Sequence, residues 1–434
     1  MAKCFHLGII SLTLLLSSAS ISPRLFAEER SQLIKQYIGE DAVQALHEQL
    51  PAYLTNRQIA NISFGVWQDG LLVTEGYYGP VSEAERKTVS ETSIHRIQSM
   101  TKPITAVGLL ILMERGHFKL SDPITDFLPE FARTETLADH DADGNLYTYR
   151  APHPPTMAQL LSHTAGLGYW RAEGGPIDQK LFDANIARSE NTDQLVQAAA
   201  QVPYASMPGA EWRYSIASDL QGAIIERITG EPLSTFLETE IFTPLGMHDT
   251  RFHVPAHKQA RLSGVTKRHR DRLNYVEQNL PTRAAQDKIY HEGGHGLFST
   301  QRDYFLFLDF LQSDGRSAIG PLLLPETLDQ LRTNAITYRQ RPGRQNGRGG
   351  GAGLGYGFGV GIIENPSIAK MSAPKGTYYW HGSLGTWFWV DPRNDIIFVG
   401  MIQSETSIEP NPMKLSMHAI YGDGTETSYT NPPS

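Results

Sequence analysis

The order of apolar and polar positions divides the chain into three parts, with strand patterns near both ends and helical patterns between them. Residues 62–67 alternate as a strand does, 68–70 carry turn residues, and 71–74 form a returning strand, so a hairpin is predicted. Strand-like runs recur at 357–363, 377–380, 386–390 and 396–401. Helices are predicted at 30–50, 101–115, 158–162, 192–201, 218–229 and 233–241.

This order predicts an α/β (α+β) protein in which one lobe is built from both termini and a helical lobe is inserted into it. We place the α/β lobe at about 28–100 and 290–434, and the all-helical lobe at about 101–289. The sequence shows no internal repeat, and its 434 residues are enough to give both lobes well-filled cores.

The first residues form a separate pattern. Lys3 precedes an apolar run at 7–16, small residues follow, and Ala27 stands just before the charged residues 28–30. This is the order of a secretory signal peptide, and the apolar run is too short to span a bilayer. We therefore expect residues 1–27 to be removed, with cleavage at the cluster of small residues 19–22 as the alternative. The mature protein is expected to be periplasmic or secreted, without a membrane anchor.

Composition narrows the possible partners. The hydrophobic fraction of 40% and the charged fraction of 19% are typical of a globular protein. The formal net charge is −8, and it becomes −10 without residues 1–27, which disfavours nucleic acid and anionic membranes as partners. The single cysteine, Cys4, lies in the signal segment, so we expect neither disulfides nor thiolate metal sites in the mature chain.

The string Ser99-Met100-Thr101-Lys102 runs directly into the helix predicted at 101–115. A spacing of three residues places the hydroxyl and the ammonium on the same face of one helical turn. Serine needs an adjacent base to become a nucleophile, and a lysine can be that base when burial keeps it neutral. By itself, however, the spacing also fits a solvated helix face.

Two further segments supply what a Ser–Lys site requires. Tyr214 follows a loop that begins at Pro208-Gly209, and a phenol near cations can relay protons. Residues 380–385 join two predicted strands, and their glycines allow the backbone to approach a ligand closely. A backbone N–H from this segment, together with that of Ser99, would form an oxyanion hole.

Other candidate segments favour structural roles. Residues 139–144 resemble the start of a calcium loop, but Arg150 occupies the twelfth position, so a turn-and-hairpin insertion is predicted. The Gly- and Arg-rich residues 341–355 are interpreted as a flexible surface loop rather than an RNA-binding segment. We also predict structural roles, and no metal site, for three histidines: His163, His291 and His295.

Further motifs follow one another along nearly the whole mature chain. They are Leu120-Ser121-Asp122-Pro123-Ile124, Leu160-Leu161-Ser162-His163-Thr164-Ala165-Gly166-Leu167, Pro208-Gly209 before Tyr214-Ser215, Thr243-Pro244-Leu245-Gly246-Met247, and residues 293–300. With them the chain resembles the serine hydrolases of the β-lactamase and penicillin-binding-protein superfamily. The resemblance is to the branch of class C β-lactamases, D-alanyl-D-alanine carboxypeptidases, family VIII carboxylesterases and 6-aminohexanoate-dimer hydrolases. It implies a β-lactamase/transpeptidase-like fold, with an antiparallel sheet flanked by helices.

The resemblance also implies catalytic roles, position by position. Ser99 would be the acylated nucleophile, Lys102 its proton acceptor or electrostatic helper, and Tyr214 the general base and then the acid. Leu384 would add the second oxyanion N–H to that of Ser99, with a register shifted by one residue as the alternative. Which of Lys102 and Tyr214 is the working base stays open, because the two titrate as a pair.

Substrate contacts are implied for the residues that replace the family's K-T-G strand motif, His381-Gly382-Ser383. Tyr169 and Trp170 are candidates to line the acyl pocket, with ordinary packing in the helical lobe as the alternative. No cofactor and no metal are implied, and the expected partner is a small-molecule ester or amide.

Two departures from the family pattern bear on the substrate. Ile216 stands where the Y-x-N motif has an amide, and His381 stands where K-T-G has a fixed cation. Losing both contacts should weaken carboxylate-bearing amide substrates by roughly 1–3 kcal/mol per unmatched group. We therefore expect an exported carboxylesterase with weak or no β-lactamase activity. The alternatives are a D-amino-acid amidase, peptidase or β-lactamase on the same site, and a non-catalytic penicillin-binding sensor.

Overall fold

The computed structural model describes residues 38–170, 174–270, 272–276, 290–317, 319–340 and 351–422. The predicted signal segment 1–27, and residues 341–350 of the predicted surface loop, lie outside these ranges. In the described part of the chain, no helix is long and apolar enough to cross a membrane.

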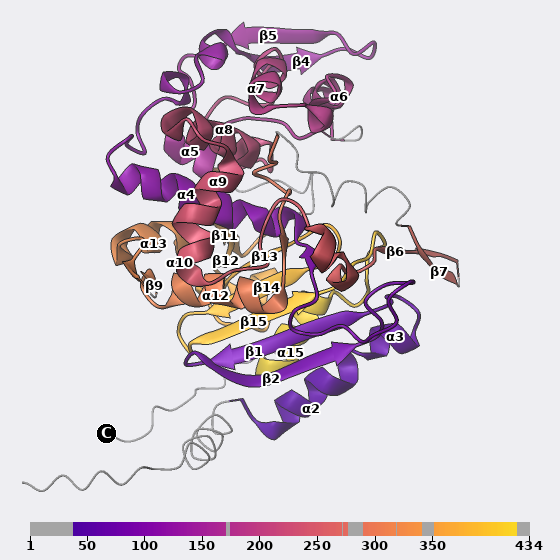
Figure 1. Cartoon of the computed structure of the whole chain (residues 1–434). Coiled ribbons are helices and arrows are strands. Elements are labelled where there is room, and N and C mark those ends of the chain that lie inside the picture. Colours follow the sequence, from indigo (N-terminus) through magenta and orange to yellow (C-terminus); the bar gives the residue numbers. More distant parts are fainter. Residues whose placement is uncertain are drawn as a thin grey trace, which may run out of the picture.

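A seven-stranded antiparallel sheet joins the two ends of the chain, as the sequence predicts (Figure 1). Its order is β11-β12-β13-β14-β15-β1-β2. The N-terminal hairpin pairs with the last strand, so that Trp67 lies opposite Ile397. The strands are β1 (Ile62–Gln68), β2 (Leu71–Tyr78), β11 (Leu354–Tyr356), β12 (Gly361–Ile363), β13 (Tyr378–His381), β14 (Trp387–Asp391) and β15 (Ile396–Met401).

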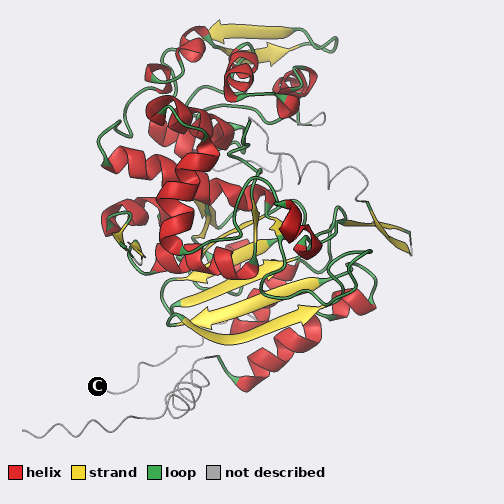
Figure 2. Ribbon diagram, viewed as in Figure 1, coloured by secondary structure: helices red, strands yellow, loops and turns green. Residues whose placement is uncertain are grey.

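Helices cover both faces of this sheet (Figure 2). On one face α2 (Glu40–Gln49) and α15 (Pro412–Tyr421) contribute Leu46 and Met417 to a core with Trp389 and Phe398. On the other face α4 (Thr101–Glu114) and α12 (Gln301–Gln312) form the larger core. Because both faces are covered, β1, β14 and β15 are buried along their whole length.

The segment inserted between β2 and β11 is mainly helical. Its helices are α5 (Met157–Leu161), α6 (Pro176–Asp183), α7 (Thr192–Ala200), α8 (Ala217–Thr229), α9 (Leu233–Leu237) and α10 (Thr243–Leu245), followed by α12 and α13 (Pro325–Arg332). Short elements complete the described fold: α3 (Ala52–Thr55), α14 (Pro366–Ala369), β3 (His95–Arg96), β8 (Phe298–Ser299), β9 (Arg316–Ser317) and β10 (Gly320–Pro321).

Two hairpins also lie in the region predicted to be all helical. They are β4 (Glu135–His140) with β5 (Leu146–Arg150), and β6 (Thr266–His269) with β7 (Arg272–Tyr275). The first is the predicted turn-and-hairpin insertion. At its tip the Asp141 carboxylate accepts hydrogen bonds from the backbone N–H groups of Asp143 and Asn145, so this acid closes the turn.

Helix α4 is the centre of the molecule. Its sequence is apolar on every side, and each residue from Thr101 to Leu112 is buried. Helix α8 packs along it, and Gly108 leaves room for Ile225 and Leu237. The helix ends at Glu114, two residues before Gly116, whose φ of +82° suits a glycine after a helix end.

We expect Leu109→Ala to lower the free energy of unfolding by about 2–5 kcal/mol, because this side chain of α4 is fully buried. Urea unfolding followed by circular dichroism measures the change. Leu72→Ala is the matched control, since Leu72 is 44% exposed on β2 and its loss should cost less than about 0.5 kcal/mol. Equal losses in the two variants would contradict the central position of α4.

Candidate active site

Ser99 and Lys102 lie where a short helical turn joins α4. Ser99 is in the 3₁₀ turn Gln98–Met100, and Lys102 is in the first turn of α4. The Lys102 Nζ is 3.5 Å from the Ser99 Oγ. Gln98, directly before the nucleophile, has a φ of +50°, a strained value for a residue with a side chain, which often marks a functional site.

The Lys102 side chain is completely buried, so its ammonium depends on partners inside the protein. It donates to the carbonyl oxygen of Gly294 over 2.7 Å. Its Nζ also lies 4.6 Å from the centre of the Tyr214 ring and 5.8 Å from that of Tyr169, within the range of cation–π attraction. The lysine therefore faces the nucleophile, a carbonyl and two phenol rings.

Tyr214 completes the predicted catalytic group. Its hydroxyl donates to the Ser99 Oγ over 2.8 Å. Tyr214 stands just before α8, whereas Ser99 stands just before α4, 115 residues earlier in the chain. The structure thus brings together the three residues that the sequence predicts to be catalytic, from two parts of the fold.

Asp219 was missed by the sequence reasoning, although it holds the loop that binds Lys102. Its buried carboxylate, in the first turn of α8, accepts hydrogen bonds from the Gly294 N–H over 3.0 Å and from the Tyr290 hydroxyl over 3.2 Å. Burial and this carboxylate raise the pKa of Tyr290 well above its usual value. The signal in the sequence is an acid five residues after Tyr214, with a pair of glycines at 293–294 that lets the loop approach it.

The turn after β13 lies against the segment that precedes Ser99. The Gly382 N–H donates to the Thr386 carbonyl, and the Thr386 hydroxyl donates to the carbonyl of Ile97 over 3.2 Å. The Ser383 hydroxyl donates to the Gln98 side chain over 3.3 Å. The predicted residues Gly382 and Ser383 are therefore beside the nucleophile.

The side chains of β13 bear on the register of this motif. The Trp380 ring, not that of His381, lies against Tyr214, with 5.6 Å between ring centres. His381 stacks on Trp380 at 5.5 Å. With Trp380 as the residue that faces Tyr214, the alternative register would make Ser383 the oxyanion donor in place of Leu384. In the described part of the chain, the N–H groups of both donate to no protein acceptor.

Tyr169 and Trp170 form an aromatic wall next to Tyr214. Tyr169 lies 5.3 Å from Tyr214 and 5.2 Å from Trp170, measured between ring centres. Trp170 in turn lies 5.5 Å from His295, which the sequence reasoning did not assign to the site. The Tyr169 N–H donates to the buried carboxylate of Asp178, which fixes the start of this wall.

His291 lies against the Phe252 ring at 4.7 Å, and the described residues hold no group of three metal-ligating side chains.

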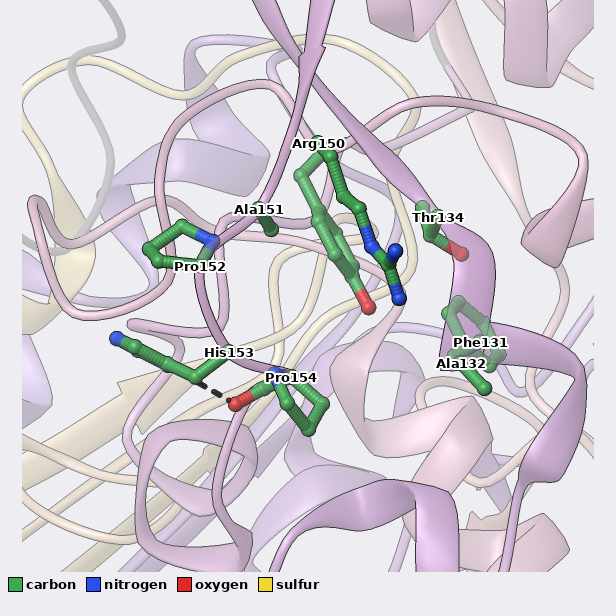
Figure 3. A pocket seen from close by; sticks show the side chains of 9 residues that line it. Phe131, Ala132, Thr134, Arg150, Ala151, Pro152, His153 and Pro154 are labelled. Carbon is green, nitrogen blue, oxygen red and sulfur yellow. Dashed lines mark hydrogen bonds between the residues drawn. The ribbon is translucent and has the colours of Figure 1, made fainter.

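A separate cavity of about 310 Å³ lies beside the β4–β5 hairpin (Figure 3). None of the predicted site residues lines it; its lining is Phe131, Ala132, Thr134, Arg150, Ala151, Pro152, His153, Pro154 and Tyr204.

Comparison with known proteins identifies the family. The family model described as Beta-lactamase matches residues 35–417. The chain belongs to the Beta-lactamase family. It is 31% identical over 343 residues to Protein Rv1367c of Mycobacterium tuberculosis, which covers 78% of this chain and 84% of that protein. It is 29% identical over 398 residues to Esterase EstB of Burkholderia gladioli. This match covers 86% of this chain and 91% of EstB.

Solved structures of this family have the same fold. Simvastatin Synthase (LovD) from Aspergillus terreus matches with a TM-score of 0.76 and 24% identity, over 89% of this chain and all of that one (100%). The Beta-lactamase-family relatives include esterases and acyltransferases. The predicted β-lactamase/transpeptidase-like fold and the assignment as a serine hydrolase are thereby confirmed.

We expect Gly382→Ala to lower kcat/KM for hydrolysis by about 10- to 100-fold, because small displacements in a catalytic centre have effects of this size. A Cβ on Gly382 would collide with the Thr386 hydroxyl and lie 2.5 Å from the Ile97 carbonyl oxygen. Gly39→Ala is the control, since a Cβ there meets nothing within 4 Å. Steady-state assays that give Gly382→Ala the same kcat/KM as the control would contradict the position of this turn.

Proposed function

We propose that the protein is an exported carboxylesterase that acts through an acyl-Ser99 intermediate. The contact that carries this proposal is the 2.8 Å hydrogen bond between the Tyr214 hydroxyl and the Ser99 Oγ, with the buried Lys102 Nζ 3.5 Å from the same oxygen. Because the side-chain oxygen of the nucleophile contacts two titratable groups, it has a route for its proton during attack.

In the first half of the reaction, the Lys102–Tyr214 pair starts one proton short, as an amine with a phenol or as an ammonium with a phenolate. The Ser99 Oγ attacks the ester carbonyl carbon and its proton passes to this pair. The negative charge on the carbonyl oxygen is stabilised by backbone N–H groups of Ser99 and of the turn after β13. The pair then protonates the departing alkoxide, which leaves as an alcohol. In the second half, water gives its proton to the same pair and attacks the acyl-enzyme, and Ser99 recovers its proton as the acid leaves.

The lining of the site favours uncharged acyl groups. Ile216 is 1% exposed and stands just before α8, so it offers no amide to a substrate. His381 stands where the family motif has a fixed cation and stacks on Trp380, whose ring lies against Tyr214. A carboxylate bound there would lose hydration without gaining a fixed positive partner, which costs binding energy.

The decisive experiment compares the wild-type protein with Ser99→Ala. We expect Ser99→Ala to lower hydrolysis of a short-chain p-nitrophenyl ester by about 10³-fold or more, because it removes the nucleophile. Intact-protein mass spectrometry after brief mixing should find one acyl adduct on the wild type and none on the variant. Unchanged turnover in Ser99→Ala would overturn the assignment.

Nitrocefin, tested in parallel, separates the alternatives. We expect its turnover to be slow compared with that of the ester, since His381 replaces the fixed cation of the family motif. Stable labelling by nitrocefin without ester turnover would favour a penicillin-binding sensor, and faster release of D-alanine from a peptide would favour a peptidase.

Export is supported by the order of charged, apolar and small residues at the N-terminus. Expression of the full chain in a Gram-negative host, followed by N-terminal sequencing, should give a periplasmic protein that begins at Glu28. Cleavage after the cluster 19–22 would move the boundary. Retention of Met1 in the cytoplasm would contradict export.

A further inference from the structure

His163 is buried at the end of the turn that follows α5, and its backbone is hydrogen-bonded to the loop that carries Tyr214. His163 is 1% exposed and has a φ of +56°. Its carbonyl oxygen accepts a hydrogen bond from the Arg213 N–H over 2.9 Å. The residue is therefore joined to the segment that carries the phenol, although it does not contact Ser99.

The hydrogen bonds of the ring determine its protonation state. The backbone N–H of Ser215 donates to the His163 Nδ1 over 3.2 Å, and a backbone N–H can only donate. The Nδ1 must therefore carry a lone pair, and the proton of the neutral ring is on Nε2. The Nε2 has no hydrogen-bond partner in the described protein, and the ring meets Tyr356 edge to face at 5.4 Å.

The surroundings oppose a charged ring. Lys102, Tyr214, Trp212 and Tyr356 face the imidazole, and none of these four side chains is a carboxylate. Burial, and then the charge of Lys102, lower the pKa of His163 well below its usual value. A neutral ring also avoids placing a second positive charge beside Lys102, which would change the proton affinity of the catalytic pair.

The same ring contacts Tyr214 in two ways. The Ser215 hydroxyl lies 3.0 Å from the Nδ1, so both polar groups of the residue after Tyr214 meet one nitrogen. The imidazole also stacks on the Tyr214 ring, with 5.1 Å between centres and 29° between planes. Together these contacts restrict the backbone and the ring plane of the phenol that donates to Ser99.

We propose that His163 is a positioning residue that, as the neutral Nε2–H tautomer, fixes the Tyr214 phenol against Ser99 through Ser215 and by ring stacking. The effect of this positioning on kcat rests on the proposed ester hydrolysis. The structural part of the proposal, the tautomer and the contacts, does not depend on the substrate.

Two substitutions separate the hydrogen bond from the packing. His163→Phe keeps a ring and removes the acceptor, whereas His163→Asn keeps an acceptor oxygen near the position of Nδ1. We expect His163→Phe to lower kcat by about 100-fold, the effect of a small misplacement in an active site, with KM within about threefold. His163→Asn should recover at least about tenfold of that loss, because it restores the partner of the Ser215 N–H.

The matched control is His47→Phe. His47 is a partly buried histidine of α2 that also makes two side-chain hydrogen bonds, to Tyr78 and Thr74, but it lies on the opposite face of the sheet from α4. Its replacement should leave kcat unchanged. Labelling with a fluorophosphonate counts the folded active sites in every variant. If kcat per labelled site is unchanged in His163→Phe, the positioning role is wrong.

Nitrogen-15 NMR of the histidine side chains tests the tautomer without any substrate. We expect one buried imidazole, assigned by its loss in His163→Asn, to keep the Nε2–H pattern from pH 5 to about 9. A ring protonated on Nδ1, or one that titrates in this range, would overturn the proposal. Failure of the ester assay alone, with the Nε2–H pattern intact, would instead overturn the proposed function.

Discussion

The arrangement of the site follows from the burial of one ammonium group. Lys102 has no exposed surface, and the helix that carries it is apolar on every side. An ion in such a place is tolerated only where polar partners surround it. The Gly294 carbonyl supplies one, and the rings of Tyr169 and Tyr214 supply the face of a π system. The loop of Gly294 and the inserted lobe must therefore close over α4 before the lysine is stabilised.

The segments that make the catalytic contacts are fixed by buried groups that do not themselves touch Ser99. Asp219 fixes the loop of Gly294, and the turn after β13 is fixed on Ile97 by Thr386. His163 holds the segment of Tyr214 through the N–H of Ser215. Since each of these bonds joins segments far apart in the sequence, the precision of the site depends on the closed tertiary structure and not on one helix turn.

The sequence predicts those parts of the fold in which local pattern and tertiary environment agree. Strand alternation at 62–67 and the Asp69-Gly70 turn gave the β1–β2 hairpin, and Gly116 marked the end of α4. The inward face of β13 could not be predicted, because Tyr378, Tyr379 and Trp380 are all buried and the pattern there has no polar side. The hydrogen bond between Asp219 and Gly294 could not be predicted from local sequence either, since Gly294 lies 75 residues further along the chain.

The antiparallel pairing of β1 with β15 has a consequence for how the molecule is assembled. The hairpin of β1 and β2 is finished early in synthesis, but one of its edges has no strand to pair with until residues 396–401 are available. Closure of so long a loop makes sheet formation a late and slow step, during which an apolar strand edge is open to intermolecular pairing. The yield of refolding should therefore fall as the protein concentration rises, even under conditions in which the finished fold is stable.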